Sequence, residues 1–285
     1  MAKAAREKTK GEMHMNFTQI AELAAYLRDV PEGQDFELAF DVEKITFHPI
    51  AQGGAEESVA VSAAEWREAL AKRGLVNAYA LYGQTEQEIE EQGFTYSRLW
   101  GVLTVFADGR KTYWTPVAER TQWTEVEREF KVKRWWMERT VRRKEKWPVY
   151  SVDYTEREVT GAPADWPKFT DCSEELARVY KELAELCKDI GEKYFGGRFR
   201  EGCRVLTDAA EPGMSEQMRK HFPKMTGAKL RLYNAALYSQ VFGGMGSWND
   251  VPAGRADAAN RSEDYRRLSA ELSRYGRMAE MYALN

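Results

Sequence analysis

The alternation of apolar and polar residues predicts two kinds of structure in succession along the chain. Before about residue 160 the pattern is mixed: some segments have the helical period, and others have apolar residues at every second position, which is the period of a strand with one buried face. After about residue 170 they recur every three to four residues, which is the period of an amphipathic helix. The pattern therefore predicts an α+β protein, with an N-terminal part rich in antiparallel sheet with flanking helices and a C-terminal helical part.

In the first part, capping residues and breakers set the expected ends of the elements. Asn16 is placed to cap the first helix, and Pro31 to end it. Ser62 and Glu65 have the spacing of a capping box, in which the serine oxygen accepts a free amide while the glutamate reaches back. The expected elements are a helix over 17–29, strands over 35–42 and 44–50, a helix from 62 to Gly74, a strand over 76–82, and a short acidic helix between Thr85 and Gly93.

The clearest local signal is a hairpin at Asp108-Gly109, a pair that tolerates the positive φ angles of a type I′ turn. Beyond it, TEVEREFKVK (124–133) alternates with Val126, Phe130 and Val132 on one face, and VYSVDYTEREV (149–159) alternates as well. We expect these two segments to pair as a long hairpin. Its distal end would then carry the stretch KVKRWWMERTVRRKEKW, residues 131–147.

Two prolines and small turn residues interrupt the pattern around 160–170, and this composition suits a linker. After it, an apolar stripe from Leu176 to Tyr194 predicts a helix that Gly196-Gly197 would end. Two more helices are expected, over about 228–242 and from Ser262 onward. The predicted organisation is a flexible tail over 1–15, an α+β domain over 16–160, a linker over 161–170 and a helical domain over 171–285.

Composition narrows the class of protein. The net charge is −3, so any site for a polyanion would have to be a local patch. No apolar run approaches the roughly 20 residues that span a bilayer, and the basic, polar N-terminus does not resemble a secretory signal, so no membrane contact is expected. The three cysteines form no CxxC, and an odd number argues against a disulfide framework. These features favour a reducing cytoplasm.

Candidate chemistry is sparse. The three histidines lie far from any partner with metal-ligand spacing, so no metal site or cofactor is expected. Cys187 belongs to the apolar stripe, whereas Cys203 lies between Arg200 and Arg204, whose charge would favour a thiolate. His221 could act as a base, although an exposed loop histidine is the simpler interpretation. The segment FGGRFREG (195–202) could hold phosphate, or it could be a helix end followed by a loop.

The segment FGGMGSWND, residues 242–250, resembles the GGMGS(F/W)ND tail of uncharacterised bacterial proteins, many of them from mobile loci. The resemblance covers about one helix and the loop after it. It implies a bacterial or phage origin and no particular reaction. Physically, Gly243 and Gly244 would end a helix, Trp248 would fold back on it, and Asn249 and Asp250 would bind turn amides.

The stretch 131–147 is the strongest candidate for a functional surface, because it holds eight basic residues against two acidic ones and three tryptophans. Lys and Arg can neutralise phosphates while indoles stack on unpaired bases, so a nucleic-acid-binding module is one hypothesis. Trp and Arg are also enriched at hot spots of protein interfaces, and this second hypothesis requires neither catalytic residues nor a basic chain. The residues proposed to contact a partner are Arg134, Trp135, Trp136, Arg139, Arg142, Arg143, Lys144, Lys146 and Trp147.

The interpretation that fits the pattern best is a non-enzymatic cytoplasmic protein that binds, and so could inhibit, a protein partner. Nucleic-acid binding through 131–147 is the alternative, and a small-molecule enzyme using Cys203, His221 or the nearby arginines is a further one. The oligomeric state does not follow from the pattern.

Overall fold

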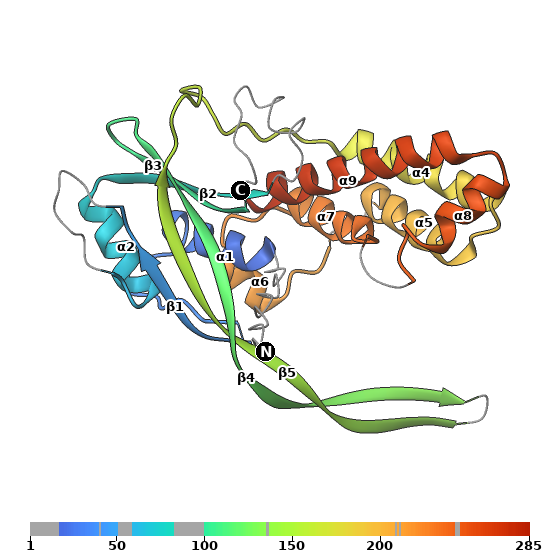
Figure 1. The fold of residues 1–285 in the computed structure, drawn as a ribbon, viewed down its shortest axis with the longest axis horizontal. Helices are drawn as coiled ribbons and strands as arrows, with labels where there is room; N and C mark the ends of the chain where they lie inside the picture. Colours follow the sequence, from blue (N-terminus) through green and yellow to red (C-terminus); the bar gives the residue numbers. More distant parts are fainter. Residues whose placement is uncertain are drawn as a thin grey trace, which may run out of the picture.

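The computed structural model describes residues 17–39, 41–50, 59–82, 100–134, 137–208, 210, 212–242 and 246–285. The described chain forms a five-stranded mixed sheet with the strand order β1-β5-β4-β3-β2, together with helices beside the sheet and a helical C-terminal part (Figure 1). The α+β class predicted from the sequence is confirmed.

Within the described residues, the N-terminal part contains two helices and five strands: α1 (Phe17–Arg28), β1 (Val42–His48), α2 (Ala63–Lys72), β2 (Leu75–Tyr82), β3 (Trp100–Phe106), β4 (Lys111–Arg134) and β5 (Met137–Glu158). The C-terminal part contains the helices α4 (Ser173–Asp189), α5 (Lys193–Thr207), α6 (Glu216–His221), α7 (Gly227–Ala236), the 3₁₀ turn η1 (Leu237–Ser239), α8 (Val251–Ala258) and α9 (Ser262–Leu284). The predicted short helix from Thr85 lies outside the described residues.

Local signals placed most N-terminal elements correctly. The capping box forms at α2, where Ser62 Oγ accepts from the Glu65 amide at 3.2 Å and the Glu65 carboxylate accepts from the Val61 amide at 2.9 Å. The strand predicted over 35–42 is wrong, because 34–39 have no regular structure and the strand begins only at Val42. β1 pairs in parallel with the edge of β5, from Val42 opposite Tyr150 to His48 opposite Thr155.

The hairpin between β3 and β4 forms at Asp108-Gly109, but the turn is not type I′. Among the described residues only Asn260 is a non-glycine residue with positive φ, so Asp108 lacks the positive φ that type I′ requires. Gly109 has φ +83° and its amide donates to the Phe106 carbonyl at 2.9 Å. This is a type I turn followed by a left-handed glycine, the usual three-residue hairpin connection.

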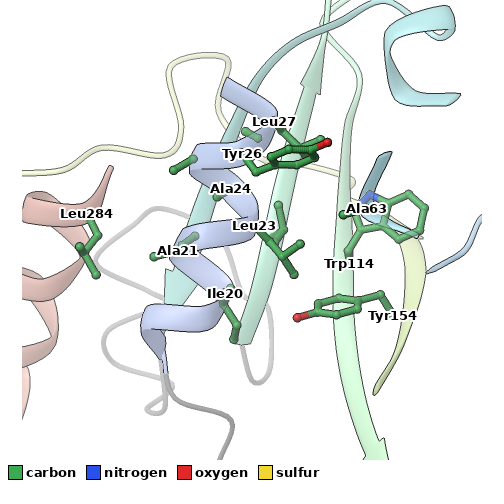
Figure 2. Packing of buried hydrophobic residues seen from close by; sticks show 14 of the residues in the cluster. Ile20, Ala21, Leu23, Ala24, Tyr26, Leu27, Ala63, Trp114, Tyr154 and Leu284 are labelled. Carbon is green, nitrogen blue, oxygen red and sulfur yellow. The ribbon is translucent and has the colours of Figure 1, made fainter. Parts of the chain in front are cut away.

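One face of the sheet is covered by α1, which is buried on both of its sides. Figure 2 shows Leu23 directed toward Trp114 on the sheet and Ala21 directed toward Leu284 at the end of α9. The same apolar cluster includes Leu230 of α7. The C-terminal helices therefore pack into the same core as the sheet.

The opposite face of the sheet is covered by the segment that the sequence predicts to be a linker. Trp166 is 3% exposed and packs with Leu81, Leu103 and Tyr113. The Lys111 ammonium donates to the carbonyls of residues 163 and 164, at 2.6 and 3.0 Å. The segment 161–170 is thus an ordered connection held against the sheet.

In the helical part, one helix ends earlier than the sequence predicts. The helix that begins at Ser173 ends at Asp189 and does not extend to Gly196-Gly197, which lie inside α5; Tyr194 is accordingly 70% exposed. Glycines inside a helix usually cost stability, but at Gly202 an added Cβ would lie 2.8 Å from the Tyr180 ring. Close packing of α5 on α4 explains why glycine occurs there.

The segment after η1 folds back on the helices, as the sequence predicts, and Trp248 is fully buried. The Asp250 carboxylate accepts hydrogen bonds from the amides of Gly246 and Ser247 at 2.6 and 3.3 Å. The expected helix over 228–242 is shorter, since α7 and η1 end at Ser239. Gly243 and Gly244 lie outside the described residues.

A buried carboxyl group gives the helical part a distinctive pH dependence. Glu280 in α9 is 4% exposed, and burial raises its pKa from 4.5 to about 7, although the Gln240 side chain donates to it. Between pH 4.5 and 7 the folded state therefore binds more protons than the unfolded state. Stability from this group is fully present below pH 4.5 and is lost as pH rises through 7, with an upper limit of about 3 kcal/mol.

We expect Glu280→Gln to be more stable than the wild type at pH 8, and similar to it at pH 5, because the amide is neutral at both pH values. Urea unfolding at the two pH values measures the difference. Glu263→Gln, at an exposed position of the same helix, is the matched control and should show no such pH-dependent difference. A Glu280→Gln curve that shifts in parallel with the wild type at both pH values would contradict the prediction.

Candidate functional site

The predicted long hairpin exists and extends beyond the rest of the sheet. β4 and β5 pair continuously from Thr112 opposite Glu158 to Arg134 opposite Met137, with one irregularity between Arg120 and Gln122. β3 pairs with β4 only up to Trp114, and β1 pairs with β5 only from residue 150 onward. Among the described residues, 121–134 and 137–149 thus form a two-stranded ribbon without a third strand. We call 121–149 the arm (Figure 1).

The arm is long enough to contact another macromolecule. The paired residues from Gln122 to Arg134 span roughly 40 Å at the usual rise per residue. Figure 1 shows this part of β4 and β5 extending away from the sheet and the helices. The amides and carbonyls on its outer edges have no strand partner within the described part of the chain. Such a ribbon is marginal alone and presents edges that another chain can use.

Charges on the arm are arranged by the strand register. Glu125 lies opposite Lys146 and Glu127 opposite Lys144, so acidic positions of β4 face basic positions of β5. Lys144 Nζ lies 3.4 Å from Glu125 Oε2, and both side chains are more than half exposed. An exposed pair of this kind contributes under about 1 kcal/mol. The acidic neighbours predicted from the sequence are therefore present.

Aromatic side chains lie at the base of the arm. Trp147 is half-buried, and its indole N–H donates to the Glu145 carboxylate at 3.4 Å. Trp123, which is not among the residues predicted from the sequence, is 54% exposed, and the Arg120 guanidinium lies 4.9 Å from its ring centroid. The strand alternation could have identified Trp123, because it directly precedes 124–133 and has the same parity as Glu125 and Glu127 on the polar face.

The structure brings four of the predicted partner-binding residues together and leaves others undescribed. Arg142, Arg143, Lys144 and Lys146 are exposed on consecutive or alternate positions of β5. Their alternation along the strand distributes them over both faces of the arm. Arg134 and Arg139 occupy paired backbone positions, opposite Met137 and Val132, while Trp135 and Trp136 lie outside the described residues.

Among the contacts of the described residues, none joins the candidate nucleophile Cys203 to the candidate base His221. Cys187 is buried, and burial raises the pKa of its thiol to about 12, which confirms its packing role. Cys203 is half-buried in α5, where Arg204 pairs with Glu201 and Asp208. The expectation of an exposed loop histidine at 221 is wrong.

His221 ends α6 and its side chain is 11% exposed, with Nδ1 2.8 Å from Glu22 Oε1. Burial raises the pKa of Glu22, although the contact with His221 opposes the shift. His48 forms a more exposed contact with Asp153 at 3.2 Å.

The described ranges contain neither a candidate metal site nor a candidate membrane span. No group of three or more His, Cys, Asp or Glu side chains there is arranged to hold a metal ion. No helix in the same ranges combines the length and the apolar character needed to cross a bilayer.

The fold and the site define an α+β protein with a projecting, charged two-stranded arm. Comparison with protein-family models, with curated proteins and with solved structures finds no significant match to this chain.

Proposed function

We propose that this protein is an interaction module that binds an acidic surface of a protein partner through the arm. The observation that carries the proposal is the two-stranded ribbon of roughly 40 Å, which continues past the sheet and exposes Arg142, Arg143, Lys144 and Lys146. A ribbon without a third strand gains little stability from its own packing. Contacts with a partner would supply the missing stabilisation.

Charge supports an acidic partner. Residues 121–149 contain nine basic and five acidic residues, a net charge of +4, whereas the whole chain carries −3 and the rest therefore carries −7. This asymmetry would steer the arm toward a negative surface and away from a positive one. An acidic body on a second copy of the chain is one surface of that kind, so self-association is an outcome that the test must distinguish.

The surface area of the arm limits how a partner can bind it. With two strands about 5 Å apart, one face of a 40 Å ribbon presents roughly 400 Å². A stable interface buries about 800 Å² on each partner. The partner would therefore contact both faces of the arm, or one face and the adjoining body near Trp123. Trp123 and the arginines are the residue types that dominate interface energetics.

A second candidate, nucleic-acid binding, is supported by Arg142-Arg143-Lys144, because a two-stranded ribbon fits the major groove of DNA. Glu125, Glu127 and Glu145 lie among the basic residues and would repel phosphates. This interleaving favours a protein partner over a polyanion.

For the setting of this function we propose the cytoplasm of a bacterium, or of a bacterium that carries a phage or mobile element. Cys172, Cys187 and Cys203 are free thiols, which suits a reducing compartment. The GGMGS(F/W)ND resemblance supports the bacterial or phage origin.

Shortening the arm should abolish partner binding and leave the fold intact. In the shortened variant an Asn-Gly turn replaces 125–146 and joins Thr124 to Trp147, which are register partners. A second variant, Arg142→Glu with Arg143→Glu, keeps the arm and reverses part of its charge. Quantitative affinity capture from a bacterial lysate, with thermal unfolding of each variant, measures the effect.

The matched control is Lys181→Glu with Arg266→Glu, which makes the same charge change on exposed positions of α4 and α9. We expect a protein retained by the wild type and by this control to be lost, at least tenfold, from both arm variants. Equal retention by all variants would refute the proposal. Loss of the retained protein on nuclease treatment would favour nucleic acid, and a concentration-dependent dimer in light scattering would identify a second copy as the partner.

A further inference from the structure

A cleft far from the arm in sequence lies between α5 and α7 in the helical part. It has a volume of about 570 Å³, within the range of small-molecule sites. Residues at helical spacing on each helix face it: Arg198, Glu201 and Val205 from α5, and Arg231, Asn234 and Tyr238 from α7 and η1. Pro212 and Gly213 line it at one end.

The charges of the cleft are unevenly balanced. Arg204 is neutralised by two carboxylates, since it bonds Glu201 at 2.6 Å and Asp208 at 2.9 Å. The hydrogen bond from Arg204 lowers the pKa of Glu201, so this carboxylate is ionised at neutral pH and is bound to Arg204. Arg198 and Arg231 form no ion pair with any described residue. Three arginines and two carboxylates line the cleft, so its net charge is +1, and Arg198 and Arg231 are the two guanidiniums that bond no carboxylate. Arg231 is also near enough to Asp208 to help lower the pKa of that carboxyl group.

Both of these arginines are held in place by neutral contacts that use few of their donors. Arg198 donates one N–H to the Leu237 carbonyl at 2.7 Å and lies over the Tyr238 ring at 5.4 Å. Arg231 donates one N–H to the Ala210 carbonyl at 3.2 Å. In both side chains Nε is buried and has no hydrogen-bond partner in the described structure. A guanidinium has five donors, so most of this capacity is unused by the fold.

We propose that this cleft binds the phosphate group of a small organic phosphate, with Arg198 and Arg231 as the phosphate-binding residues. Two guanidiniums from separate helices match a dianion with three acceptor oxygens, and the planar N–H fork of arginine fits phosphate in a bidentate manner. The walls formed by Val205, Leu237 and Tyr238 would contact the organic body of the ligand. The segment FGGRFREG thus supplies a phosphate ligand, Arg198, from a helix.

Isothermal titration with adenosine 5′-monophosphate, inorganic phosphate and succinate tests the proposal on the full chain. We expect the nucleotide to bind more tightly than inorganic phosphate, because only the nucleotide contacts the apolar walls, and succinate to bind weakest. Arg198→Gln and Arg231→Gln should each weaken nucleotide binding at least tenfold, as loss of a charge-assisted contact implies. Arg231→Lys keeps the charge without the fork and should fall between the wild type and Arg231→Gln.

Arg266→Gln, at an exposed position of α9, is the matched control and should bind as the wild type does. Circular dichroism shows whether each variant is folded. If Arg198→Gln unfolds because its bond to Leu237 is lost, the two Arg231 variants still decide the question. No binding of any probe, tighter binding of succinate than of the nucleotide, equal binding of inorganic phosphate and nucleotide, or affinities unchanged in the Arg231 variants would each overturn the proposal. Because the arm is not involved, failure here leaves the proposed function unaffected.

Discussion

Glu156→Ala is expected to destabilise the protein by about 3–5 kcal/mol, the cost of breaking a buried ion pair from one side. The Glu156 side chain is fully buried in β5, and Arg73, which follows α2, bonds both of its oxygens at 2.9 and 2.6 Å. The same carboxylate accepts from the Ile50 amide at 3.1 Å. The substitution therefore removes the counter-charge of the Arg73 guanidinium, whose side chain is only 10% exposed.

Urea unfolding followed by far-UV circular dichroism measures the change in midpoint. The double variant Arg73→Met with Glu156→Met should be more stable than Glu156→Ala, because it leaves neither charge in the protein interior. The control is Glu68→Ala, which removes an exposed carboxylate of α2 paired with Lys72 and should leave the midpoint nearly unchanged. A Glu156→Ala midpoint equal to that of Glu68→Ala would show that the pair does not tie α2 to the sheet.

Trp248→Ala is expected to cost a similar amount, about 3–5 kcal/mol, for a different physical reason. Trp248 is fully buried, and its ring lies 5.3, 5.1 and 5.1 Å from the rings of Phe195, Phe199 and Tyr265. Its indole N–H donates to Ser269 at 2.7 Å. Truncation leaves a large cavity between α5 and α9 and removes that hydrogen bond.

The matched control is Trp123→Ala, because this indole is 54% exposed and its loss should change stability by under about 1 kcal/mol. Trp248→Phe should be intermediate, since it keeps most of the ring contacts and loses the N–H donor. The midpoints of urea unfolding for the three variants test this order. Equal midpoints for Trp248→Ala and Trp123→Ala would contradict a packing role for the GGMGSWND segment.

Local patterns predicted the elements whose periodicity is unambiguous. The alternation over 124–133 and 149–159 predicted the long hairpin, and the register confirms that the basic stretch lies at its distal end. The stripe from Leu176 to Cys187 is buried as expected. In these segments a single face is apolar over many residues, so the period identifies both the element and the side that packs.

Other elements were missed because their local signals conflict with the tertiary structure. Gly196 and Gly197 have the appearance of a helix end, yet α5 continues through them; an added Cβ at Gly196 would lie 3.0 Å from the Cys187 Cβ. The apolar residues of 35–42 alternate like a strand, but of the described residues in this range only Val42 belongs to one. The short helices α6 and α8 carry too few turns for periodicity to reveal them.

The candidate sites likewise include features that local patterns predict and features that they do not. The sequence predicted the charge of the arm and its acidic neighbours, because strand partners follow from alternation and turn position. It did not single out Trp123, and it did not associate Arg198 with Arg231, which are brought together only by the packing of α5 on α7.

Local sequence patterns account for the α+β class, the main strands and helices, the hairpin and its basic distal stretch, since all of these depend on contacts between residues close along the chain or in simple register. Long-range packing is what pairs β1 in parallel with β5, brings the C-terminal helices into the core of the sheet, and places Arg198 and Arg231 in the lining of one cleft. Those features depend on contacts between distant segments, which no local period encodes.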